Sequence, residues 1–266
     1  MSRNREKTVP MRTLLAGATL VAILSVAGCV SQGPARQQSA MDQALQDHIQ
    51  LGFGYLGEGN REAARFHLRK ALEIDKNSPG AHNGMALLYQ MQLENELAEK
   101  HYRKAIALDK GFSSARNNFG VFLFQQQRFE EAYEQFAAAA ADTGYNLRAQ
   151  AYLSQGIVAR RLDRPDEAVQ AWRKAVALDP NLAGAYLELA RFYFDNGDYP
   201  RSREMLQKYD RLGKPQPQSL WLAVRLEHRF GNRDAMASKG LALEKLFPYS
   251  KENLEYQKWL KNDRSK

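Results

Sequence analysis

The chain has 266 residues, of which 44% are hydrophobic and 26% are charged, so it is long enough to bury a sizeable core. Its single cysteine excludes an intramolecular disulfide. The formal net charge is +8, of which residues 1–28 carry +3. In the rest of the chain, which carries +5, basic residues are interleaved with acidic ones, and this pattern disfavours nucleic acid as a partner.

The segment 1–28 has the pattern of a secretory signal peptide. Basic residues between positions 3 and 12 precede an apolar run over residues 14–27, which is short for a membrane-spanning helix. The run ends in Val26-Ala27-Gly28-Cys29, a sequence that resembles a bacterial lipobox. We therefore predict cleavage before Cys29 and lipidation of its thiol, which also explains the lone cysteine of a secreted chain.

Val30, not aspartate, follows the cysteine. The sorting rule that the lipobox resemblance implies sends such a lipoprotein to the outer membrane, where acyl chains would anchor it facing the periplasm. Residues 29–44 are small and polar and are predicted to form a flexible tether of roughly 20 Å. The domain that follows, residues 45–266, is then expected to lie close to the inner leaflet.

From residue 45 onward the sequence repeats at a regular period, defined by a column of small residues and a later column of large apolar residues. The small column comprises Gly52, Ala86, Gly120, Gly156 and Ala190, and the large column comprises Leu68, Tyr102, Phe136, Trp172 and Leu206. Small residues let two helices approach while a bulky side chain fills the space opposite. Each unit therefore reads as two antiparallel helices that must stack on the next unit.

The turn between the two helices of a unit is short and is marked by glycine in some repeats, as at Gly59 and Gly197. Glycine in such a turn supplies the positive φ that ends a helix.

The pattern Leu51-Gly52, Tyr55, Gly59, Ala64 and Leu68 resembles the tetratricopeptide repeat. The resemblance implies an all-α fold, a right-handed superhelix of six repeats closed by a C-terminal capping helix. The repeats are placed at residues 45–78, 79–112, 113–146, 149–182, 183–216 and 217–250, and the cap at 251–264. The sixth repeat is degenerate, with Met236 and Gly240 in the alanine columns.

One step of the small column, from Gly120 to Gly156, is longer than the others. It lies between the third and fourth repeats, with its extra residues within 141–148. An insertion there is expected to change the superhelix angle locally and to divide the solenoid into two surfaces.

The chain carries no motif for nucleophilic, phosphate-binding or zinc-peptidase chemistry. In each of the pairs His48/His82 and His67/His101 the two histidines are one repeat period apart, so the repeat alone explains them. Equivalent positions of stacked repeats lie about 10 Å apart, too far for ligands to converge on one ion. We therefore predict a non-enzymatic protein with no metal and no cofactor.

A partner-binding groove is predicted on the inner face of the superhelix, at positions three before, one after and four after the small column. Its candidate residues are Ile49, Phe53, Leu56, Asn83, Leu87, Asn117, Val121 and Phe124. Apolar side chains would cover an apolar segment of another protein, and the two amides would hydrogen-bond its backbone. For each residue, packing between repeats is an equally good alternative, because apolar character alone does not prove binding.

Several segments resemble one family of repeat proteins, the type IV pilus biogenesis and stability lipoproteins, which are the pilotins of the pilus secretin. These segments are residues 48–56, 69–75, 117–123 and 128–133. The resemblance implies a scaffold that binds secretin subunits, brings them to the outer membrane and promotes their multimerisation for pilus assembly and twitching motility. The alternative is another envelope adaptor, regulating peptidoglycan enzymes or outer-membrane protein assembly. An enzyme built on a repeat scaffold finds no support among the motifs.

Overall fold

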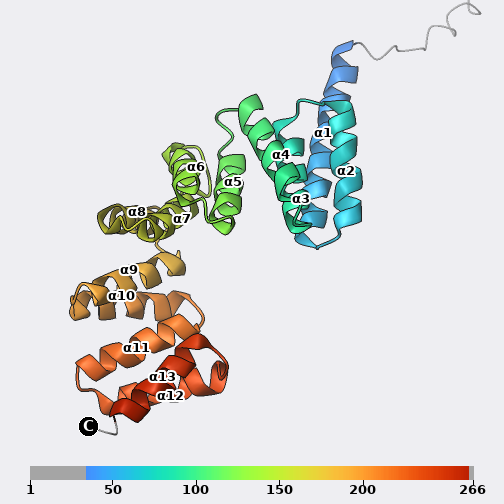
Figure 1. Cartoon of the computed structure of the whole chain (residues 1–266). Helices are drawn as coiled ribbons and strands as arrows, with labels where there is room; N and C mark the ends of the chain where they lie inside the picture. Colours follow the sequence, from blue (N-terminus) through green and yellow to red (C-terminus); the bar gives the residue numbers. More distant parts are fainter. Residues whose placement is uncertain (1–33, 264–266) are drawn as a thin grey trace, which may run out of the picture.

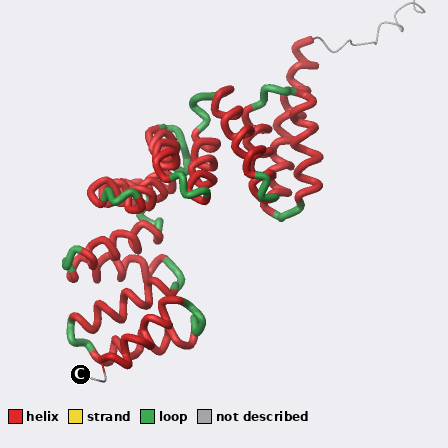
Figure 2. Tube along the Cα trace, in the orientation of Figure 1, coloured by secondary structure: helices red, strands yellow, loops and turns green. Residues whose placement is uncertain are grey.

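The computed structural model describes residues 34–263, and every regular element within that range is an α-helix. The helices are α1 (Pro34–Gly57), α2 (Arg61–Ile74), α3 (Pro79–Met91), α4 (Asn95–Leu108), α5 (Ser113–Gln125), α6 (Phe129–Ala141), α7 (Arg148–Arg161), α8 (Pro165–Leu178), α9 (Ala183–Asp195), α10 (Tyr199–Leu212), α11 (Pro217–Arg229), α12 (Arg233–Leu246) and α13 (Lys251–Asp263). They stack into a curved solenoid whose two ends lie far apart (Figures 1 and 2).

Helices α1 to α12 form six antiparallel pairs, one for each predicted repeat, and α13 packs on α11 and α12 at the end of the stack. We call the odd-numbered helices α1 to α11 the first helices and the even-numbered helices α2 to α12 the second helices of their repeats. The prediction of an all-α superhelix of six tetratricopeptide repeats with a C-terminal capping helix is confirmed.

The two columns of the repeat meet inside each helix pair. A Cβ atom added to Gly156 would lie 2.4 Å from Nε1 of Trp172, whose side chain is fully buried. A Cβ atom on Gly120 would lie 2.9 Å from the ring of Phe136. The bulky side chain of the second helix thus occupies the space that a larger residue in the small column would need, because the interior is close-packed. The small column is therefore a steric requirement of the helix pair.

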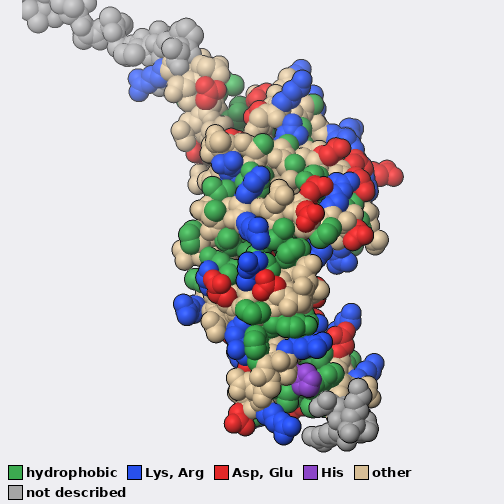
Figure 3. Space-filling view, turned by 90° about the vertical axis from the view of Figure 1, so that its left-hand side faces the viewer, with side chains coloured by type: hydrophobic (Ala, Val, Ile, Leu, Met, Phe, Trp, Pro, Cys, Tyr) green, Lys and Arg blue, Asp and Glu red, His purple; other side chains and the backbone are tan. Residues whose placement is uncertain are grey.

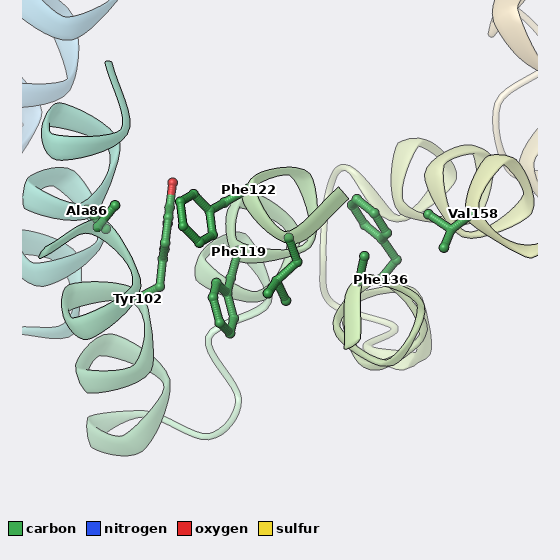
Figure 4. Packing of buried hydrophobic residues seen from close by; sticks show 9 residues of the cluster. Ala86, Tyr102, Phe119, Phe122, Phe136 and Val158 are labelled. Carbon is green, nitrogen blue, oxygen red and sulfur yellow. The ribbon is translucent and has the colours of Figure 1, made fainter. Parts of the chain in front are cut away.

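One core runs through several repeats. A cluster of buried side chains extends from Ala86 on α3 and Tyr102 on α4, through Phe122 on α5 and Phe136 on α6, to Val158 on α7 (Figure 4). Because each repeat contributes only part of such a cluster, no repeat buries its apolar surface without its neighbours.

The turn inside every repeat passes through one residue with positive φ. These residues are Gly59, Leu93, Gln127, Asp163, Gly197 and Gly231, spaced at the repeat period. Glycine was predicted in this role at positions 59 and 197, and the structure confirms both. In the second, third and fourth repeats non-glycine residues take the same conformation, because the helix pair on either side fixes the chain reversal.

The helix α1 corrects one prediction. Residues 34–44, which we expected to belong to a flexible tether, form the first turns of α1, and residues 36–43 are exposed. Side-chain hydrogen bonds one turn apart, Gln38 to Asp42 (2.9 Å) and Gln43 to Asp47 (2.7 Å), support this extension, and Pro34 is compatible with a first helical position. The predicted signal peptide and Cys29 lie outside the described residues.

The insertion after the third repeat forms a packed turn. The Asp142 carboxylate accepts hydrogen bonds from Ser113 Oγ (2.6 Å) and from the backbone N–H of Gly144 (2.9 Å), and these bonds lower its pKa. Tyr145 is buried in a cluster with residues that include Ala139 and Ala151. The extra residues therefore have a defined structure and join α6 to α7.

The packing of the helices changes at this turn. The predicted change of the superhelix angle stays a prediction. Consecutive first helices contact each other at α1–α3, α3–α5, α7–α9 and α9–α11, whereas α5 and α7 make at most a weaker contact. Instead α6 packs on α7 more extensively than any other second helix packs on the next first helix. Figure 1 shows the helix axes turning over the same stretch. We call α1–α6 the N-terminal half and α7–α13 the C-terminal half.

Candidate partner-binding groove

The inner face of the solenoid is built by the first helices. They contact one another along each half, whereas the second helices lie on the outside of the stack. The inner positions fall on one stripe of each first helix because they are spaced three or four residues apart. This stripe carries the candidate groove residues, which differ in how much of each side chain reaches solvent.

In the N-terminal half, most of the predicted groove residues present part of their surface to solvent. Val121 is 39% exposed, and Ile49, Phe53, Leu87, Asn117 and Phe124 are half-buried. Leu56 is only 8% exposed and belongs to the core of the first two repeats. The accessible apolar surface is therefore centred on Phe53, Val121 and Phe124.

The half-buried residues also hold neighbouring repeats together. Ile49 lies against Gly80 of the next repeat, where an added Cβ atom would approach the Ile49 side chain to 3.2 Å. Leu87 packs against the cores on both sides of it, whereas the ring of Phe124 lies 5.4 Å from that of Phe129 within the same repeat. Ile49 and Leu87 therefore pack between repeats and also remain partly exposed to solvent.

The amide prediction requires a correction at Asn83. Its side chain is 1% exposed, and its Oδ1 accepts a hydrogen bond from Asn118 Nδ2 (3.2 Å), so it cannot reach a partner in this conformation. Asn117 is half-buried, and its Oδ1 has no hydrogen-bond partner among the described residues. Gln90, four positions after the small column, accepts from the Tyr102 hydroxyl (2.6 Å) and donates to Gln125 (2.8 Å). The amides bond mainly to their own scaffold.

The inner face of the C-terminal half has a different chemistry. Its inner positions in the last three repeats include Arg160, Arg191, Phe194, Trp221, Arg225 and His228. Arg160 forms an ion pair with Glu188, which Arg191 approaches to 3.6 Å. The sixth-repeat positions were missed from the sequence because that repeat is degenerate. Projecting the inner positions by one further repeat period finds them.

The histidines converge in a way that the sequence did not predict. His48 and His67, and likewise His82 and His101, place their Nδ1 atoms 2.9 Å apart and join the two helices of one repeat. The prediction compared histidines one full period apart, whereas the interacting partners are 19 positions apart. In the third repeat Arg116 and Gln135 make the equivalent link (3.1 Å). Each pair is therefore a cross-link between the helices of one repeat.

Burial lowers the pKa of both histidines in the second repeat. The pKa of His101 falls to about 4, chiefly because of burial and secondarily because of His82 and Lys100. The Nε2 of His82 bonds the carbonyl of Lys76 (3.1 Å), which leaves its Nδ1 to accept from His101. Both imidazoles are neutral at pH 7. Within residues 34–263, no three side chains of the types that bind metals come together as a site.

An ion-pair cluster ties the second and third repeats together on the outside. Arg128 contacts Glu99 (2.7 Å) and Glu131 (2.7 Å), and Arg103 contacts the same two carboxylates. These contacts raise the pKa of Arg128 and lower the pKa of Glu99 and Glu131.

No described helix is long and apolar enough to cross a bilayer.

Stacked helix pairs with a continuous inner stripe define a tetratricopeptide-repeat protein, a class of protein-interaction scaffold. The tetratricopeptide-repeat family profiles match residues 48–78, 83–146 and 159–222. The type IV pilus assembly protein PilF of Pseudomonas aeruginosa is 38% identical over 245 residues, which cover 90% of this chain and 97% of the relative.

Two solved structures extend the comparison. The structure of Pseudomonas aeruginosa PilF superposes with a TM-score of 0.78 at 38% identity, covering 82% of this chain and 98% of that one. PilW, described as a widely conserved type IV pilus biogenesis factor, superposes with a TM-score of 0.70 at 26% identity, covering 81% and 99%. The chain belongs to this family of tetratricopeptide-repeat proteins of type IV pilus biogenesis.

Proposed function

We propose that this protein is a non-enzymatic pilotin, a lipoprotein that binds secretin subunits and promotes their localisation and multimerisation in the outer membrane. The observation that carries the proposal is the inner face of the N-terminal half in a chain of the pilus biogenesis family. Phe53, Val121 and Phe124 present accessible apolar surface on one side of a rigid stack. Such a surface fits an apolar segment of another polypeptide better than a small-molecule substrate.

The physical role of the groove would be to cover a client segment until assembly. A secretin subunit that has not yet assembled would expose apolar surface, and transfer of such surface from water to the groove is favourable by about 25 cal/mol per Å². Because the first helices pack on one another, the groove is pre-formed and little ordering entropy is lost on binding.

Anchoring would follow from Cys29. Lipidation of this residue, together with Val30 behind it, would hold the protein at the outer membrane and carry a bound subunit there. Because α1 already begins at Pro34, the link between the lipid and the first helix would be short. The groove of the N-terminal half would then work close to the bilayer.

The proposal is tested first by deleting the gene. Secretin multimers in the outer membrane, surface pili and twitching motility should all be lost, and the full-length chain should restore them. A Cys29→Ser variant should mislocalise and should restore the multimers poorly. Normal secretin multimers in the deletion strain would rule the proposed role out.

A second test addresses the groove itself. The variant Phe53→Gln/Val121→Gln/Phe124→Gln should abolish secretin capture, whereas Leu87 is left unchanged because it packs in two cores. The matched control replaces three exposed apolar residues of second helices, Phe66, Leu97 and Leu178, by glutamine and should capture secretin normally. Equal helical circular dichroism of the two variants shows that both fold. Recovery of peptidoglycan enzymes or barrel-assembly machinery in place of secretin would favour the alternative adaptor role.

A further inference from the structure

The C-terminal half contains a pocket that the proposed groove does not use. Its volume is about 320 Å³, and it lies where α9, α11 and the capping helix α13 meet. We call it the C-terminal pocket; it is lined by Phe194, Arg225, His228, Arg229 and Trp259. The lining combines two guanidinium groups, an imidazole and two aromatic rings, and contains no carboxylate.

Arg225 is the central feature of this pocket. Its guanidinium lies 4.5 Å from the ring centre of Phe194 and 5.5 Å from that of Trp221, and its side chain is half-buried. Its Nε atom is buried and has no hydrogen-bond acceptor within the described part of the chain. An arginine fixed between two rings is pre-organised to offer its remaining N–H groups to a ligand.

Two other half-buried arginines of the same half are neutralised by carboxylates, and Arg225 is not. Arg160 pairs with Glu188, and Arg203 pairs with Glu227 (2.8 Å). No carboxylate among residues 34–263 lies within ion-pair distance of Arg225. Burial lowers the pKa of Arg225, the charges of Asp195 and Glu255 oppose this shift, and the charge of Arg191 adds to it.

The nearest glutamates of the capping helix already have partners. Glu252 accepts a hydrogen bond from Gln218 (2.7 Å), and Glu255 accepts one from Trp221 Nε1 (3.1 Å). Glu255 also lies 3.7 Å from Lys251. These bonds hold the glutamates beside Trp221 and leave the open side of Arg225 to a ligand from outside.

We propose that the C-terminal pocket binds a carboxylate of a partner polypeptide together with the apolar side chain next to it. The carboxylate would accept paired N–H bonds from Arg225, and the adjacent side chain would lie against Phe194 and Trp259. Basic and hydrophobic side chains are interleaved near the C-terminal end of the face in Figure 3. Arg and Trp are also the residues that most often dominate binding energy at protein interfaces.

A peptide is favoured over a lipid headgroup for two reasons. The pocket continues the row of inner positions that forms the groove, and its aromatic walls offer contact area that a bare phosphate would not use. It also lies at the end of the solenoid opposite α1, the helix nearest the predicted lipid anchor (Figure 1). The proposal depends on the proposed function only for the identity of the client, which would be a secretin segment bearing an acidic residue.

The test uses the full chain and two labelled peptides, one containing Glu-Phe-Glu and one containing Gln-Phe-Gln, in fluorescence anisotropy. The acidic peptide should bind at least about tenfold more tightly than the amide peptide, and Arg225→Gln should remove that difference. The matched control is Arg211→Gln, an exposed arginine of α10 that lies outside the pocket, which should change binding less than about twofold. Arg225→Lys, which keeps the charge but not the paired donors, should bind with intermediate affinity.

Any of three peptide or vesicle results would overturn the proposal: equal binding of the two peptides, unchanged binding by Arg225→Gln, or Arg225-dependent binding of phosphatidylglycerol vesicles without peptide binding. Inorganic phosphate that displaced the acidic peptide at equal concentration would also overturn it, because it would show a general anion site. A thermal melt by circular dichroism confirms that each variant is folded. Peptide binding is measured without secretin, so a failure to bind peptide would not contradict the proposed pilotin role. Conversely, normal secretin assembly in the deletion strain would contradict the pilotin role but not peptide binding by the C-terminal pocket.

Discussion

The two halves of the solenoid share one repeat and differ in what that repeat presents. In the N-terminal half the inner face carries Phe53, Val121 and Phe124, and its amides bond to one another or to the scaffold. In the C-terminal half three of the same positions carry arginines, which are Arg160, Arg191 and Arg225. The columns that build the helix pairs are common to both halves, so the fold leaves the inner positions free to vary. The break between α5 and α7 separates the two chemistries.

The halves can be observed separately in one sample. All three tryptophans, Trp172, Trp221 and Trp259, belong to the C-terminal half. Tryptophan fluorescence therefore reports that half, while far-UV circular dichroism reports every helix. In a repeat protein, stability is a sum of local terms, so a local change can shift one signal more than the other.

The largest effect is expected from Gly156→Ala. The added methyl group would lie 2.4 Å from the buried Trp172 ring, and we expect a loss of about 3 kcal/mol of unfolding free energy from overpacking. The fluorescence midpoint in urea should fall more than the circular dichroism midpoint. The control is Gly54→Ala, where an added Cβ atom meets nothing within 4 Å and stability should be unchanged or slightly higher. Equal midpoints for the two variants would contradict the steric account.

A smaller effect is expected at the junction of the halves. Tyr145→Ala would remove a buried ring from the turn between α6 and α7 and should cost about 2 kcal/mol. If Tyr145 couples the halves, the two optical transitions of this variant should separate further than in the parent chain. A single shared transition would show instead that the helix packing alone carries the coupling.

The smallest effect is a pH dependence confined to the N-terminal half. The pKa of His101 lies at about 4 in the folded chain, below its ordinary value near 6.5, so the unfolded state binds more protons between these values. Stability should therefore fall as the pH drops from about 7 toward 4. Because His101 is only partly buried, we expect about 1 kcal/mol after solvent screening.

The pH measurement has an internal control. Circular dichroism melts should shift with pH while tryptophan fluorescence melts shift less, and His101→Gln should reduce the difference. A fluorescence shift as large as the circular dichroism shift would place the responsible groups elsewhere.

Much of the architecture could be predicted from the sequence because repetition reveals it. The columns headed by Gly52 and Leu68 predicted five helix pairs, and the degenerate sixth repeat and the resemblance to the repeat family predicted the sixth pair and the cap. The position of the insertion predicted where the stack changes. These features follow from the spacing and size of residues along the chain, and the same spacing recurs in each repeat. The inner positions in the first five repeats followed from the same columns.

Tertiary structure alone decided which of those positions remain accessible. Asn83 and Leu56 fit the inner stripe, yet neighbouring helices bury both. Asn118 donates a hydrogen bond to the Asn83 side-chain amide, which we had expected to bond to a partner. The histidine pairs were equally hidden, because their members meet only once two helices are folded back on each other. The position of Arg225 between two aromatic rings, with a buried Nε atom that has no acceptor among the described residues, also depends on the tertiary structure. Exposure and pairing depend on the neighbours of a side chain in space, and a repeat period specifies only its neighbours along the chain.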